Sequence, residues 1–179
     1  MNLIKATVIG LDAFKAQIAS ASKELKAEVN AELEASAMEF AALARRDVQK
    51  NGGNKGMLMK SISYAPDGEL AYKVSANVFY APFIEFGTKS KFNPYPGTEE
   101  YASQFKGAKQ SGALKLIDAI KGWVKRKGIA AGKEADRVAF LIARSIYRKG
   151  ISPKPFFFKQ VPIVRNSLTQ RITALLNGI

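Results

Sequence analysis

The sequence contains no cysteine and no histidine in 179 residues. These absences exclude disulfide bonds, metal sites built on thiolate or imidazole, and catalytic triads that use either residue. No unbroken apolar stretch reaches the length of about 18 residues that a membrane helix needs. The stretch Met1–Gly10 also lacks the basic start and long apolar run of a secretory signal. We therefore expect neither a membrane partner nor a signal peptide.

Phosphate-binding loops and catalytic carboxylate pairs are also missing. Gly52, Gly53 and Gly56 follow a predicted helix and lack the Lys-Ser/Thr ending of a nucleotide-binding loop. The acidic pairs Glu99-Glu100 and Glu134/Asp136 lie in a loop or at a helix start, where acidic residues are favoured for structural reasons. The sequence therefore predicts no metal site, no cofactor and no nucleotide hydrolysis.

Acidic residues are scarce in the second half of the chain. Residues 1–90 carry 11 Lys+Arg and 10 Asp+Glu, whereas residues 91–179 carry 17 and 5. Of the net charge of +13, the second half thus supplies +12. One interpretation is a solvated cationic surface; the other is a face that meets nucleic acid or an acidic neighbouring subunit.

The length and the 47% hydrophobic content are typical of a single domain, which we assign to residues 1–179. From Leu11 to about Lys50 there is no glycine or proline, and apolar residues recur at helical spacing. A helix of this length would approach about 60 Å, more than the chain needs to cover its own core. Part of it should pack on a neighbouring chain, or it breaks in two. Most of its glutamates are expected on a solvated face.

A small antiparallel sheet is predicted beside this helix. Residues 1–10 form a short strand or arm, and residues 56–62 form a helical turn that leads into a strand at Ser61–Ala65. The turn Pro66-Asp67-Gly68 then returns the chain. Apolar and polar residues alternate from Leu70 to Tyr80, which predicts the second strand of a hairpin.

The second half is predicted to be mainly helical. Residues 89–110 show no periodicity and are interpreted as a long loop, followed by helices at 113–127 and 133–148 that end at Gly128 and Gly150. An extended segment at 153–158 precedes a C-terminal helix that Pro162 can begin. The predicted fold is α+β: a long N-terminal helix packed on a small antiparallel sheet, with a loop and helical insertion at 89–150 and a C-terminal helix.

The stretch Tyr80-Ala81-Pro82-Phe83-Ile84-Glu85-Phe86-Gly87-Thr88 carries the most local information. Pro82 suits the first turn of a helix and Gly87 suits the left-handed position that ends one, which predicts a short capped turn. Glu85 would be held in apolar surroundings, as a catalytic acid or as a structural latch. Because no second catalytic group lies nearby in the sequence, we favour the latch and expect no enzymatic activity.

Two groups of cations are candidate contacts for DNA or an acidic partner. Lys125, Arg126 and Lys127 close the first insertion helix, where they also complement the helix dipole. On the second helix, Arg137, Arg144 and Arg148 fall at roughly helical spacing, so they form either a cationic ridge or a solvated face.

Three segments carry a family resemblance. The stretch from Tyr80 to Thr88 resembles the Tyr-Ala-x-x-x-Glu-Phe-Gly-Thr signature of tail-completion, or minor tail, proteins of long-tailed bacteriophages and prophages. Gly56–Ile62 is similar to the family's Gly-x-Leu-x-x-Ser-Ile, and Pro155-Phe156-Phe157 to its Pro-Phe-Leu. The segments around Trp123–Ile129 and Ala139–Ile151 resemble the helical insertion of many members. The loop 89–111 has no counterpart in the family.

The resemblance implies a structural virion protein at the head–tail junction, assembled in the host cytoplasm into a ring, commonly sixfold, around the DNA channel. The implied neighbours are connector, tail terminator or tail tube proteins, with double-stranded DNA in the channel. Its scaffold motif would be Tyr80, Pro82, Glu85, Phe86, Gly87 and Thr88. The alternative from composition alone is a free-standing basic protein that binds nucleic acid.

Overall fold

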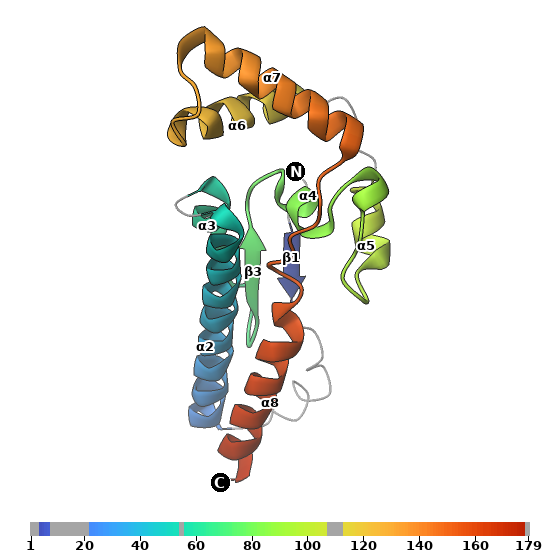
Figure 1. The fold of residues 1–179 in the computed structure, drawn as a ribbon. Coiled ribbons are helices and arrows are strands. Elements are labelled where there is room, and N and C mark those ends of the chain that lie inside the picture. Colours follow the sequence, from blue (N-terminus) through green and yellow to red (C-terminus); the bar gives the residue numbers. More distant parts are fainter. Residues whose placement is uncertain (1–3, 8–21, 54–55, 107–112, 178–179) are drawn as a thin grey trace. The chain divides into compact units, whose positions relative to one another are not determined.

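The computed structural model describes residues 4–7, 22–53, 56–106 and 113–177 (Figure 1). The chain divides into two compact units, which are described separately: Met1–Ala81 with Pro155–Ile179, and Pro82–Lys154. The predicted α+β class is confirmed, with a long N-terminal helix, a small antiparallel sheet and a C-terminal helix. None of the helices in the described ranges is long and apolar enough to span a membrane.

The sheet of the first unit has the strand order β1-β3-β2, and both pairings are antiparallel. The strands are β1 (Ile4–Thr7), β2 (Ile62–Pro66) and β3 (Tyr72–Ala76), and α3 (Met57–Ser61) leads into β2 as predicted. The hairpin is confirmed, but β3 spans Tyr72–Ala76 and not Leu70–Tyr80. Leu70 has φ +50, a left-handed backbone that cannot continue a strand.

The long helix α2 (Lys23–Val48) begins at Ser22, whose side chain accepts a hydrogen bond from the Leu25 N–H at 3.2 Å. It ends in a π-helical turn, η1 (Gln49–Gly53). The first residues of the predicted helix, 11–21, lie outside the described ranges. The C-terminal helix α8 (Gln160–Asn177) begins two residues before Pro162, which the first turn tolerates because its N–H groups need no helical partner.

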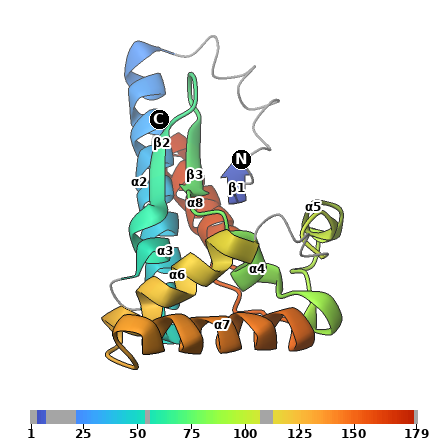
Figure 2. The ribbon, with the colours of Figure 1, turned by 90° about the horizontal axis from the view of Figure 1, so that it is seen from above.

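Helices α2 and α8 lie side by side, as both ribbon views show (Figures 1 and 2). Val29 and Leu33 of α2 pack with Leu168 and Ile172 of α8, and Tyr72 of the sheet packs against this cluster. The apolar periodicity of α2 thus serves a core within the unit, and its other face remains exposed.

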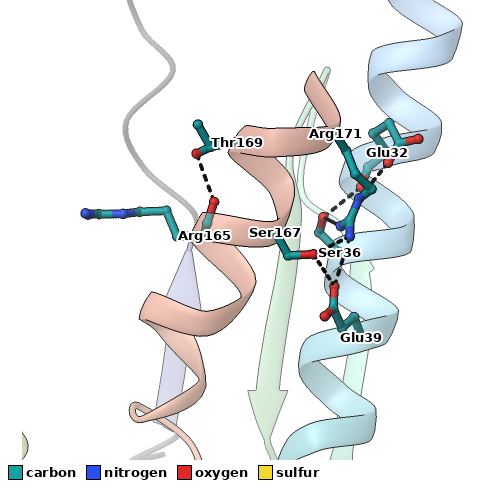
Figure 3. Close-up of polar contacts among 7 residues, drawn as sticks. All are labelled: Glu32, Ser36, Glu39, Arg165, Ser167, Thr169 and Arg171. Carbon is teal, nitrogen blue, oxygen red and sulfur yellow. Dashed lines mark hydrogen bonds and ion pairs between the residues drawn. The ribbon is translucent and has the colours of Figure 1, made fainter. Parts of the chain in front are cut away.

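A polar cluster around Arg171 of α8 links this helix to α2 (Figure 3). Its Nε lies 2.8 Å from an oxygen of Glu32, and its Nη1 lies 3.2 Å from an oxygen of Glu39. The guanidinium also donates to the hydroxyls of Ser36 and Ser167. Two glutamates of the expected solvated face therefore pair with α8, while Glu24, Glu28 and Glu34 are exposed as expected.

A second buried connection lies where the extended segment enters α8. The Gln160 side chain donates both to a carboxylate oxygen of Asp47 and to the Phe156 carbonyl, the latter at 3.0 Å. Lys159 Nζ lies 2.9 Å from Asp47 Oδ2. Burial acts to raise the pKa of Asp47, but hydrogen bonds from Lys159 and Gln160 and the nearby lysine charges outweigh it and leave the pKa lowered.

We expect Asp47→Asn to lower the free energy of unfolding at neutral pH by an amount that shrinks in acid. A carboxylate whose folded pKa is lowered stabilises the fold above its unfolded pKa, and this stabilisation is lost as pH falls through the folded pKa. The difference in the free energy of unfolding between parent and variant should therefore be largest above about pH 5. It should disappear as the pH falls below 3.8, the ordinary pKa of an aspartate. Urea unfolding at several pH values checks this, with Asp118→Asn, an exposed position on α6, as control. A difference that did not change with pH would contradict it.

The second unit contains α4 (Ala81–Phe86, whose first residue belongs to the first unit), the 3-10 turn η2 (Lys89–Lys91), α5 (Glu99–Ser103), α6 (Ala113–Arg126) and α7 (Gly132–Lys149). The prediction of a structureless loop at 89–110 was wrong in part, because η2 and α5 lie within it. A helix of five residues is too short to show periodicity. The remainder of that segment, 107–110, lies outside the described ranges.

The two predicted helices of the insertion, α6 and α7, pack against each other. Ile120 and Val124 of α6 are buried against Ala135, Ala139 and Ala143 of α7, whose small side chains allow close approach. Lys121 of α6 also forms an ion pair with Asp136 of α7. The pair thus has its own core, and residues on the opposite face of α7 are exposed among the described residues.

Candidate functional site

The predicted capped turn is present as α4. Pro82 is fully buried in its first turn, and the Gly87 N–H donates to the Phe83 carbonyl at 3.1 Å. Gly87 then takes φ +73, the left-handed value at which helices commonly end. This geometry directs Thr88 away from the helix axis and toward the end of α7.

Three hydrogen bonds join the turn to the segment that follows α7. The Thr88 N–H donates to the Ile151 carbonyl at 3.0 Å, and the Ile151 N–H donates to Thr88 Oγ1 at 2.8 Å. The Lys154 N–H donates to the Ile84 carbonyl at 2.7 Å. The turn therefore fixes the point where the helical insertion returns. Sequence reasoning missed this, because more than 60 residues separate Thr88 and Ile151 and no local pattern relates them.

Two glycines allow this close approach. A Cβ on Gly87 would lie 2.7 Å from the Lys91 carbonyl oxygen and 2.8 Å from that of Ile151. A Cβ on Gly150, which has φ +75, would overlap the Thr88 carbonyl oxygen. From the sequence, Gly150 was predicted only to end a helix. In the structure its missing side chain also allows Thr88 of the signature turn to approach closely.

Two aromatic residues of the signature, Phe83 and Phe86, meet Phe105 in the second unit, each with ring centroids 6.2 Å apart. Phe86 is buried within the second unit, with its ring centroid 6.2 Å from Phe105 in a stacked arrangement and 6.1 Å from Tyr101. Burial raises the pKa of Tyr101. Tyr80 belongs to the first unit, where it meets Phe79 edge to face. Phe86 thus anchors the turn on α5, which the sequence analysis did not predict.

Glu85 is buried in α4, as the latch hypothesis requires. We expect Glu85→Gln to lower the free energy of unfolding by about 1–3 kcal/mol, because a buried polar group that loses its matched partner carries an uncompensated desolvation cost. Thermal and urea unfolding measure this, with Glu69→Gln, an exposed position, as control. A variant that unfolded and assembled like the parent would contradict the latch.

The two groups of cations differ in how their side chains are distributed around the helices. Arg137, Arg144 and Arg148 are exposed. Arg144 and Arg148 follow Arg137 by 7 and 11 residues, so all three lie on one stripe along α7. Lys125, Arg126 and Lys127 are also exposed, but consecutive residues point about 100° apart around a helix and form no stripe. The predicted ridge therefore exists on α7 alone.

Two large apolar residues complete the α7 stripe. Phe140 and Leu141 are 55% and 52% exposed and lie on the same helical face as the three arginines. The sequence analysis did not single them out; their position between Arg137 and Arg144 was the available signal. Among the described residues no group of three or more carboxylates could hold a metal ion.

A protein-family model matches the first part of the chain. Residues 12–87 match the family model HK97-gp10-like, described as "Bacteriophage HK97-gp10, putative tail-component". This part of the chain is similar to that family. The match spans α2, the hairpin and α4, and it ends at the capping Gly87. It confirms the tail-protein resemblance drawn from the signature turn. No curated protein and no solved structure matches the chain.

The HK97-gp10-like match leaves residues 88–179 outside it. This remainder holds the α6–α7 pair, α8 and all of the net positive charge, with 18 Lys+Arg and 5 Asp+Glu. The matched segment therefore carries the long helix and most of the signature turn, and the insertion outside it carries the exposed cations of the α6–α7 pair.

Proposed function

We propose that this HK97-gp10-like tail component is a structural subunit of a ring at the head–tail junction. It would act as a tail-completion or connector protein that surrounds the DNA channel in the virion neck, without enzymatic activity. The observation that carries the proposal is the family match that runs into the Glu-Phe-Gly-Thr turn. The ring would be a hexamer, assembled in the host cytoplasm, with connector, tail terminator or tail tube proteins as neighbours.

Exposed apolar side chains of the first unit support an assembly role. Met38 on α2 is 52% exposed, and Ile163 and Leu176 on α8 are also exposed. In addition, β1 and β2 lie at the edges of the described sheet, where backbone groups can accept a strand from a neighbouring chain. These features favour contacts with other protein subunits.

The cations of the second unit support a place beside DNA. Lys and Arg side chains attract phosphates without reading bases, which suits DNA that slides through a channel. Lys125, Arg126 and Lys127 are exposed at the end of α6 and point in several directions. We assign these three to the DNA channel.

Sedimentation velocity of the full chain, alone and mixed with tail tube or connector proteins, tests the ring. A particle mass at a fixed multiple of the 19.5 kDa chain supports it. A strict monomer under all these conditions would contradict it. A monomer that bound duplex DNA, with affinity falling steeply from low to moderate salt, would instead support the free-standing nucleic-acid-binding alternative.

A further inference from the structure

We propose that the exposed stripe of α7 docks on the exposed face of α2 in a second copy of this chain. The α7 stripe consists of Arg137, Phe140, Leu141, Arg144 and Arg148. The α2 face consists of Glu24, Ala27, Glu28, Ala31, Glu34 and Ala35. The inference rests on the proposed ring and names the two surfaces that build its subunit contact.

The α7 stripe has the composition of a protein interface. Phe140 and Leu141 are more than half exposed, and arginines stand on both sides of them along the helix. An apolar centre with arginine at its border is typical of protein–protein contacts. From Arg137 to Lys149 the chain contains no acidic residue, so the occupant of this face should be acidic.

The α2 face has the complementary composition. Glu24, Glu28 and Glu34 are exposed, and Ala27, Ala31 and Ala35 lie exposed among them. The opposite side of α2 packs on α8 and the sheet. Glu34 accepts a hydrogen bond from the Tyr72 hydroxyl at 3.3 Å, and all six residues of the face are exposed among the described residues. The alanines leave shallow space between the carboxylates, which large side chains such as Phe140 and Leu141 fit.

The spacing of the charges selects an antiparallel arrangement. At 1.5 Å per residue, Arg137, Arg144 and Arg148 are separated by about 10.5 and 6 Å along α7. Read toward the N-terminus of α2, Glu34, Glu28 and Glu24 are separated by about 9 and 6 Å. In this arrangement the pairs Arg137–Glu34, Arg144–Glu28 and Arg148–Glu24 coincide along the helix axes within about 1.5 Å. Phe140 and Leu141 then lie opposite Ala31. A parallel arrangement misses by about 4.5 Å at the middle pair.

A contact between two different faces is heterologous, and such contacts generate rings when the rotation closes. DNA is the competing occupant of the arginine stripe. Phosphates do not cover Phe140 and Leu141, whereas an alanine-lined helix face removes both from water. The second copy therefore explains the apolar residues as well as the cations.

Charge exchange at the central pair tests the contact, under the conditions in which the parent chain assembles. Arg144→Glu and Glu28→Arg should each weaken self-association about tenfold or more, because each brings like charges together in the interface. The doubly substituted chain, and an equimolar mixture of the two single variants, should regain the parent particle mass in sedimentation velocity. Recovery in the mixture shows that the contact joins different molecules.

The matched control is Arg165→Glu, which reverses an exposed cation of α8 outside both surfaces and should leave the particle mass unchanged. If both single variants assembled like the parent, or if the exchange failed to restore assembly, the α7–α2 contact would be wrong while the ring remained possible. If Arg144→Glu lost only duplex DNA binding, the stripe would belong to DNA. A parent chain that never assembled would overturn the proposed function itself.

Discussion

Replacing Gly87 with alanine is expected to lower the free energy of unfolding by about 3 kcal/mol. The added Cβ would lie 2.7 Å from the Lys91 carbonyl oxygen, 2.8 Å from that of Ile151 and 2.9 Å from Pro153 Cδ. These are backbone and ring atoms that cannot move aside independently. A left-handed φ of +73 adds strain for any residue with a Cβ. Both costs act at the point that joins the signature turn to the end of α7.

Gly128→Ala separates the two costs. Gly128 has φ +66, but no atom lies within 4 Å of a Cβ built there. This variant should lose only about 1–2 kcal/mol, from backbone strain alone. Urea unfolding of both variants gives the comparison. Equal losses at the two glycines would show that the contacts of the added Cβ with Lys91, Ile151 and Pro153 carry no cost at Gly87.

Phe157→Ala is expected to cost about 3–5 kcal/mol, the range for deleting a buried aromatic side chain. Phe157 is completely buried, and its ring centroid lies 4.9 Å from Phe40 of α2 in an edge-to-face contact. Phe156 and Phe158 flank it at 6.0 and 5.6 Å. The cavity would therefore open where the extended segment enters the first unit.

Phe79→Ala is the control, since Phe79 is 38% exposed and meets Tyr80 at the surface. Its cost should stay below about 1 kcal/mol. Thermal and urea unfolding measure both variants. A loss at Phe157 no larger than that at Phe79 would mean that the three consecutive phenylalanines do not anchor the C-terminal segment.

Local chemistry in the sequence predicted the elements that depend on neighbouring residues. The absence of glycine and proline before Asn51 predicted the long helix, and Pro66-Asp67-Gly68 predicted the hairpin. Pro82 and Gly87 predicted α4. In each case the signal and the structure lie within one segment, so propensity and period were sufficient. The helix α5 was missed because five residues show no period.

Contacts between distant segments could not be predicted in the same way. The pairing of Arg171 with Glu32 and Glu39 and the hydrogen bonds between Thr88 and Ile151 depend on tertiary structure. Five of the six candidate cations lie in helices, whereas Lys127 lies in the turn after α6, and the structure shows that all six are exposed. The assignment of these surfaces to DNA or protein remains a prediction.

The most direct test of the account is a cryo-electron microscopy map of the neck in virions of the phage that encodes this chain. The account predicts a closed ring at the head–tail junction, with the α2–α8 pair and the α6–α7 pair fitting each subunit. The end of α6 should face the DNA channel. Absence of the chain from purified virions, or its location at the far end of the tail, would contradict the account.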